Sequence, residues 1–143
     1  MKQYVIISIM CLYSSLACAQ SFSLDGLTGK TWRGVSGYGG TDYMGKSLSI
    51  SQNTVDFKVW RLNAYTDVTI FVYDMYLSDT APDVFDSTQV GKHNTGRFII
   101  MNRPYNYKGD YRNDFIVEEI VSLSDNRLAL KATNGNIIVY ESE

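Results

Sequence analysis

Two adjacent carboxylates, Glu118 and Glu119, have the clearest chemical potential in this sequence. They lie in the apolar run Phe115–Leu123, whose β-branched residues are typical of a strand. Because neighbouring side chains on a strand point to opposite faces, one of the two carboxylates must point inward. A buried carboxylate needs a cationic partner, or it serves as a ligand anchor or a tuned acid/base. We expect a structural ion pair and keep the ligand anchor as the functional alternative. The candidate cations are Arg33, Arg61, Arg97 and Arg127.

The remaining polar side chains predict no metal centre and no catalytic site. Asp79, Asp83 and Asp86 offer oxygen ligands, but their spacing lacks the alternating ligands and central glycine of a calcium loop. Turn and capping roles explain them equally well. His93 is the single histidine, whereas a zinc site needs several nitrogen or sulfur ligands. No Gly-x-Ser-x-Gly or phosphate-loop motif is present, so we expect neither a cofactor nor an enzyme.

Aromatic side chains are the other candidates for binding. Tyrosines occur in two predicted loops, at residues 37–43 and 102–113. Loops held by a rigid scaffold often carry binding residues, and a tyrosine offers both ring area and a polar tip. Packing of these rings over the end of the core is the structural alternative. The predicted ligand-contacting residues are Tyr73, Glu119, Tyr105, Tyr107, Tyr111 and Trp60.

The centre of the chain predicts two strands joined by an ordered loop. Residues 68–77 are rich in β-branched and aromatic side chains on both faces, so both faces need cover. A loop, the N-terminal segment or a second subunit could provide that cover. A second strand is expected over residues 96–101. In the loop between them we expect one helical turn, capped by Thr80 with Pro82 near its first position, and Phe85 turned back onto the core.

Short strands and tight turns fill the rest of the chain. The pattern predicts about eight strands, nearly all joined as antiparallel neighbours, and an all-β fold. An up-and-down barrel removes exposed sheet edges and is our expectation, with a β-sandwich as the alternative. The clearest hairpins join residues 48–50 to 55–59 through Gln52-Asn53, and residues 128–132 to 137–140 through Asn134-Gly135.

The N-terminus has the pattern of a signal peptide. A basic start at residues 1–4 precedes an apolar stretch at 5–16, which is too short to span a bilayer. Ala17-Cys18-Ala19 is a small-x-small cleavage pattern. We therefore expect a signal peptide at 1–19 and one domain at 20–143, exported to the periplasm or the exterior. Lipidation of Cys18, which would anchor the protein to a membrane, is the alternative.

Composition narrows the class of partner. The formal net charge is −2 and there is no basic cluster, which argues against nucleic acid. Both cysteines, Cys11 and Cys18, lie in the predicted leader, so we expect no disulfide in the exported domain.

Several segments together resemble small exported bacterial lipocalin-like domains. They are Leu27-x-Gly29-x-x-Trp32, the hairpin at 48–57, Tyr76-Leu-Ser-Asp-Thr80, and the closing Leu128-x-Leu130 with Gly135 and Tyr140. The resemblance covers nearly all of residues 20–143.

This resemblance implies an eight-stranded barrel that binds a small apolar or amphipathic ligand. It also implies an arginine packed over Trp32, for which Arg127 is the nearest candidate. The alternative function is a non-catalytic interaction or accessory module with a filled core, which acts through a homodimer or a protein partner.

Overall fold

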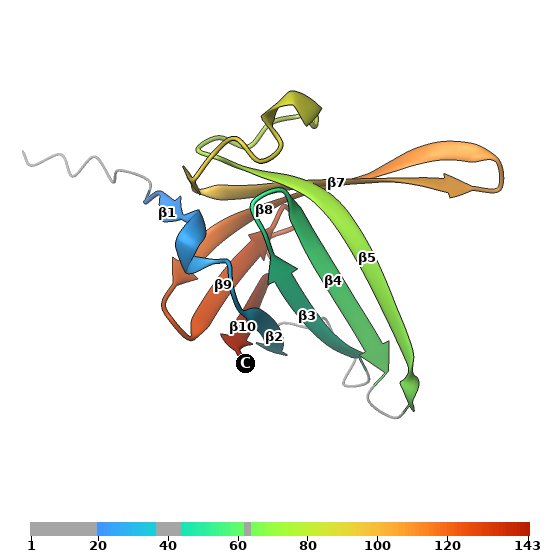
Figure 1. Cartoon of the computed structure of the whole chain (residues 1–143), viewed down its shortest axis with the longest axis horizontal. Coiled ribbons are helices and arrows are strands. Elements are labelled where there is room, and N and C mark those ends of the chain that lie inside the picture. The colour runs from blue at the N-terminus through green and yellow to red at the C-terminus, as the bar shows by residue number, and fades with distance from the viewer. Residues whose placement is uncertain (1–19, 37–43, 62–63) are drawn as a thin grey trace, which may run out of the picture.

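Eight antiparallel strands close into a barrel in the order β10-β2-β3-β4-β5-β7-β8-β9 (Figure 1). The structure, a computed structural model, describes residues 20–36, 44–61 and 64–143. The predicted signal peptide lies outside the described residues, as do Tyr38 and Tyr43. Every pairing within the barrel is antiparallel, and the expected all-β up-and-down barrel is confirmed.

Strand lengths differ greatly around the barrel. The barrel strands are β2 (Thr31–Ser36), β3 (Met44–Ile50), β4 (Thr54–Arg61), β5 (Ala64–Ser78), β7 (Phe98–Tyr107), β8 (Asp110–Leu123), β9 (Arg127–Ala132) and β10 (Ile137–Ser142). A separate two-stranded sheet pairs β1 (Phe22–Ser23) with β6 (Thr95–Gly96), and two short 3₁₀ helices occur, η1 (Leu24–Gly26) and η2 (Ser87–Gln89).

The N-terminal segment closes one end of the barrel. Side chains of Leu24 and Leu27 are buried there against Trp32, which is fully buried. The Trp32 indole Nε1 donates a hydrogen bond of 2.8 Å to the Leu27 carbonyl. The cation over the Trp32 ring is Lys30, with its Nζ 5.0 Å from the ring centroid. Arg127, which the resemblance suggested for this place, is exposed on β9 instead.

Alternation along the strands places apolar side chains inside the barrel. In the hairpin of β3 and β4, Leu48 is paired with Phe57 and Ile50 with Val55, and all four side chains are buried. Period-two alternation of this kind is what the sequence pattern predicted. The inward apolar set also includes Tyr73, Met75, Leu77, Ile99, Met101, Ile120, Leu128, Leu130 and Tyr140.

A long hairpin extends from the barrel where the sequence suggested a loop. Strands β7 and β8 remain paired out to Tyr107 and Asp110, and Figure 1 shows them projecting well beyond the other strands. Lys108 and Gly109 form the turn with φ of 51° and 88°, and the Gly109 amide donates a 2.9 Å hydrogen bond to Asn106 Oδ1. The prediction of a loop at 102–113 is therefore wrong, because these residues form paired strands and their turn. Beyond the barrel no core imposes alternation, so the sequence pattern loses its strand signal.

The connection from β5 to β7 packs on the outside of the barrel. The predicted helical turn at Thr80 is wrong, because the turn forms at η2 with Asp86 as its cap. Asp86 Oδ1 accepts a 3.0 Å hydrogen bond from the Thr88 amide. This bond caps the turn at η2 and favours it over a turn at Thr80. Phe85 does not enter the core. Its ring packs on Tyr76 with centroids 5.3 Å apart, and so covers the outer face of the C-terminal part of β5.

Truncating a side chain in the filled part of the core should destabilise the fold strongly. Leu128 is fully buried, so Leu128→Ala leaves a cavity and should lower the free energy of unfolding by about 3 kcal/mol. Val84 is 72% exposed, and Val84→Ala should change it by less than about 0.5 kcal/mol. Urea denaturation measures both. Equal effects of the two substitutions would contradict the assigned core.

Candidate functional site in the barrel interior

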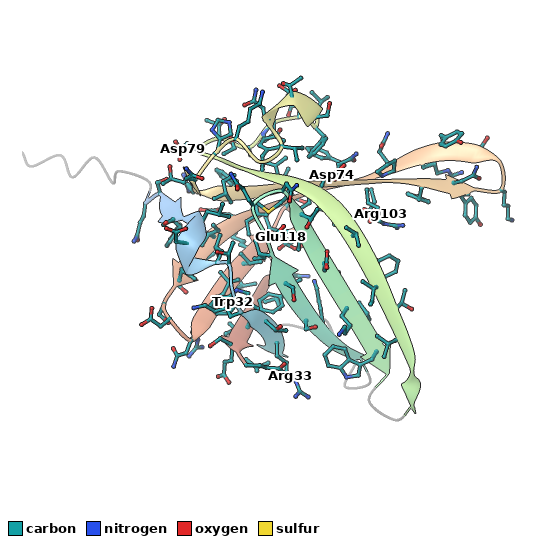
Figure 2. All side chains as sticks on the ribbon, viewed as in Figure 1. Trp32, Arg33, Asp74, Asp79, Arg103 and Glu118 are labelled. Carbon is teal, nitrogen blue, oxygen red and sulfur yellow. The ribbon has the colours of Figure 1, made fainter. Side chains whose placement is uncertain are left out.

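The pairing of β7 with β8 decides which carboxylate points into the barrel. Glu118 lies opposite Ile99, a buried core residue, and is itself only 7% exposed (Figure 2). Glu119 lies opposite Phe98 and faces outward, where its Oε1 is 2.6 Å from Arg97 Nη2. The expected carboxylate–arginine pair thus exists, but on the outer face. The inward carboxylate is Glu118, and its Oε2 has no hydrogen-bond partner within the described part of the chain.

Lys46 is the cation that accompanies Glu118. It shares the inward row of β3 with Leu48, and its Nζ lies 4.7 Å from the Phe57 ring centroid and 5.8 Å from that of Tyr140. Burial lowers the pKa of Lys46, and attraction to the Glu118 carboxylate partly offsets this. Burial likewise raises the pKa of Glu118, and the Lys46 ammonium partly offsets that. For each group desolvation outweighs the attraction, so the polar layer formed by Lys46 and Glu118 costs stability.

The polar layer separates a filled half of the barrel from a more open half. Along β8 the inward side chains run from Ile116, which is partly exposed, through Glu118 to Ile120 at 2% exposure. Phe71 and Ile138 also point inward above the layer and are partly exposed. The inward side chains at this end of the barrel are therefore less covered than those on the other side of the layer. Glu118 lies between the two sets, with Ile116 before it and Ile120 after it in the inward row of β8.

A second polar cluster joins β5 to the base of the projecting hairpin. The Tyr73 hydroxyl donates a short hydrogen bond to Asp114 Oδ2, and Arg103 Nη2 lies 3.9 Å from the same oxygen. The Arg103 guanidinium also lies 4.8 Å from the Phe71 ring centroid and 5.0 Å from that of Tyr105. Burial, followed by the hydrogen bond to Asp114, raises the pKa of Tyr73 to about 12. The cluster holds β5, β7 and β8 together where their backbones separate.

Only some of the predicted ligand-contacting residues lie close to one another in the structure. Tyr73 and Tyr105 both contact Arg103, with centroids 5.7 and 5.0 Å from its guanidinium carbon. Tyr107 lies at the hairpin tip beneath Arg112, and Tyr111 is 88% exposed on the opposite face of the hairpin.

Trp60 lies outside the barrel, on the outer face of β4. Its ring lies so close over Gly45 that a Cβ there would approach Trp60 Cε2 to 2.1 Å, and the Arg33 guanidinium lies 5.8 Å away. Only a residue without a side chain fits beneath this ring. Trp60 therefore packs as a cover over β3 and makes no contribution to the interior polar layer.

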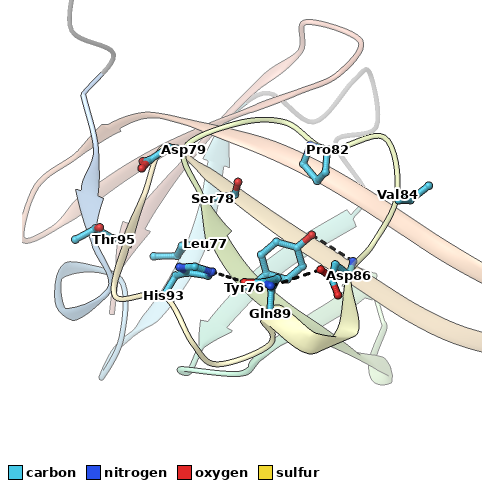
Figure 3. Close-up of a pocket in the computed structure, with 10 residues that line it drawn as sticks. All are labelled: Tyr76, Leu77, Ser78, Asp79, Pro82, Val84, Asp86, Gln89, His93 and Thr95. Carbon is cyan, nitrogen blue, oxygen red and sulfur yellow. Dashed lines mark hydrogen bonds between the residues drawn. The ribbon is translucent and has the colours of Figure 1, made fainter.

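A surface pocket of about 440 Å³ lies between β5 and the connection that follows it (Figure 3). Its polar groups largely bond to one another. His93 Nε2 is 2.7 Å from Gln89 Oε1, and the Asp86 amide donates to the Tyr76 hydroxyl over 3.3 Å. Asp86 itself is occupied as a helix cap. These contacts give the pocket residues a structural role in holding the connection against β5.

The described residues contain no group of three or more histidine, cysteine or acidic side chains placed to hold a metal ion. Within the same residues, no helix has the length and apolar character required to cross a membrane. No protein-family model matches the chain, and neither a curated protein nor a solved structure matches it significantly.

Removing the inward charge should stabilise the protein at neutral pH. Glu118 has a raised pKa, so its ionisation opposes folding above that pKa, whereas below its unfolded pKa both states are protonated and the penalty is absent. We expect Glu118→Gln to raise the free energy of unfolding by about 1 kcal/mol at pH 7 and to have little effect near pH 4. Urea denaturation at both pH values measures this difference.

The adjacent outward carboxylate provides the matched control. Glu119→Gln breaks the ion pair with Arg97 and should lower stability at pH 7 by about 0.5 kcal/mol. If both substitutions destabilise equally at neutral pH, the assigned orientation of the two carboxylates is wrong.

Tyr73 should ionise at a higher pH in the folded protein than in the unfolded chain. Its pKa of about 12, against an ordinary value of 10, means that the neutral phenol stabilises the fold below pH 10 and that this contribution disappears between pH 10 and 12. The ultraviolet absorbance titration of wild type minus that of Tyr73→Phe should therefore show a step near pH 12. A step near pH 10 would contradict the hydrogen bond to Asp114.

Proposed function

We propose that this barrel is an exported, non-catalytic binding protein that takes a small amphipathic ligand into its open half. The observation that carries the proposal is the Glu118 carboxyl. It is buried, costs stability, and has an oxygen without a hydrogen-bond partner among the described residues, and the next inward residue of β8, Ile116, is partly exposed. A ligand that donates a hydrogen bond to this oxygen would recover much of the desolvation cost.

The surrounding side chains indicate the chemistry of the ligand. Phe71, Ile116 and Ile138 offer partly exposed apolar surface above the polar layer. Lys46 and Glu118 carry charges of opposite sign, so the layer as a whole has no net charge to attract a strongly charged ligand. A neutral ligand with an apolar body and a hydroxyl or amide group therefore fits this interior better than a strongly charged one.

Two features of the sequence support this proposal. The leader-like residues 1–19 support export to the periplasm or the exterior, with a lipid anchor at Cys18 as the alternative. The resemblance to lipocalin-like domains, together with the eight-stranded closed barrel, supports a binding role, because a barrel of this size can hold one small ligand.

A neutral naphthylamine dye, which fluoresces in apolar surroundings, tests the proposal on protein stripped of bound molecules. Wild type should enhance its fluorescence, and dodecanol should displace it. Ile116→Trp fills the open half and should abolish binding, whereas Val121→Trp, on the outer face of β8, should not. Absence of dye binding by the wild type, or binding that survives Ile116→Trp, would refute the proposal.

Glu118→Gln tests the role of the carboxyl. It keeps the shape of the side chain but weakens a charge-assisted hydrogen bond, so displacement by dodecanol should need about tenfold more alcohol. Glu119→Gln, on the outer face, should leave displacement unchanged.

A further inference from the structure

The N-terminal half of β5 has a free edge. On its β7 side, β5 is paired only from Asp74 to Ser78. No described strand pairs with this edge before Asp74, and Figure 1 shows the β7–β8 hairpin diverging from it. An unpaired edge exposes a row of backbone donors and acceptors that can template another strand.

The outer face of the same segment is apolar. Val68, Ile70 and Val72 alternate along it and are 47%, 57% and 51% exposed. Edge strands are usually protected by lysine, proline or inward charges, and these three positions have none of them. An apolar stripe beside unpaired backbone is the combination that favours strand addition.

Two of the three possible covers for β5 are already used elsewhere. The connection after β5 covers its C-terminal part, where Phe85 packs on Tyr76. The described N-terminal segment inserts Phe22, Leu24 and Leu27 into the core at the closed end. Neither of these segments covers Val68, Ile70 and Val72, and no other described part of the chain does so, which favours a second subunit.

We propose that the free half of β5 pairs antiparallel with the same half of a second copy, about a two-fold axis near Val68–Ile70. Such an isologous pairing places the valine and isoleucine side chains of both copies on one face as a continuous apolar band. The neighbouring strand β4 presents one acid and one base outward, Asp56 and Lys58, beside Val72 and Ile70. The two copies therefore meet without a field of like charge.

The length of the free edge sets the strength of this dimer. It is one short strand with three half-exposed apolar side chains, less than a standard protein interface. We expect reversible association with a dissociation constant on the order of ten micromolar. The interior site is not part of this surface, so dimer formation does not depend on the proposed ligand.

Sedimentation velocity over a range of concentrations tests the dimer. Wild type should pass from monomer to dimer as its concentration rises, and Ile70→Lys should weaken association at least tenfold. Val121→Lys is the matched control, because Val121 is an equally apolar outward residue, 45% exposed on β8, and its substitution should leave association unchanged. Circular dichroism checks that each variant is folded.

Three results would overturn the proposal. They are a wild type that stays monomeric up to several hundred micromolar, association that survives Ile70→Lys, and equal loss with Val121→Lys. If Ile70→Lys fails to fold, Ile70→Thr keeps strand propensity while removing apolar surface, and it should weaken association in the same direction. A dimer that Ile70→Thr leaves intact would also refute the pairing.

Discussion

The register between β7 and β8 determines the chemical character of this barrel. Because side chains alternate across a strand, pairing Ile99 with Glu118 sends one carboxylate inward and leaves Glu119 to pair with Arg97 outside. A slip of one residue would exchange the faces of the two carboxylates and turn Glu119 inward, away from Arg97. The register therefore creates a polar layer with Lys46, at a cost in desolvation, in an otherwise apolar interior.

The sequence was sufficient to predict the barrel architecture. The prediction failed in segments that lie outside the core, where no buried face imposes an alternating pattern. The hairpin at 48–59 and the Asn134-Gly135 turn follow the predicted alternation and turn chemistry. The extension at 102–113 was predicted as a loop, since its strands have no buried face to impose alternation. The helical turn formed at Asp86 instead of Thr80, because several residues in that connection can act as caps and only tertiary packing selects one.

The sequence predicted that one of two adjacent carboxylates, Glu118 and Glu119, points into the barrel, but it did not show which one. Both rows of β8 are apolar around Glu118 and Glu119, so composition could not choose between them, and only the pairing with β7 does. Lys46 was missed, although it lies two residues before Leu48 and four before Ile50 in the inward row of β3. That spacing was the available signal. Arg103 was also missed, because its cluster joins strands that are distant in sequence.

The proposed function requires that the open half of the barrel holds a small ligand above Glu118. Native mass spectrometry of the protein isolated from the cells that produce it, followed by organic extraction, tests this most directly. We expect a single co-purifying neutral amphipathic molecule that is released on denaturation and is depleted in the Ile116→Trp variant. A mass that corresponds to the polypeptide alone, identical in wild type and variant, would contradict it.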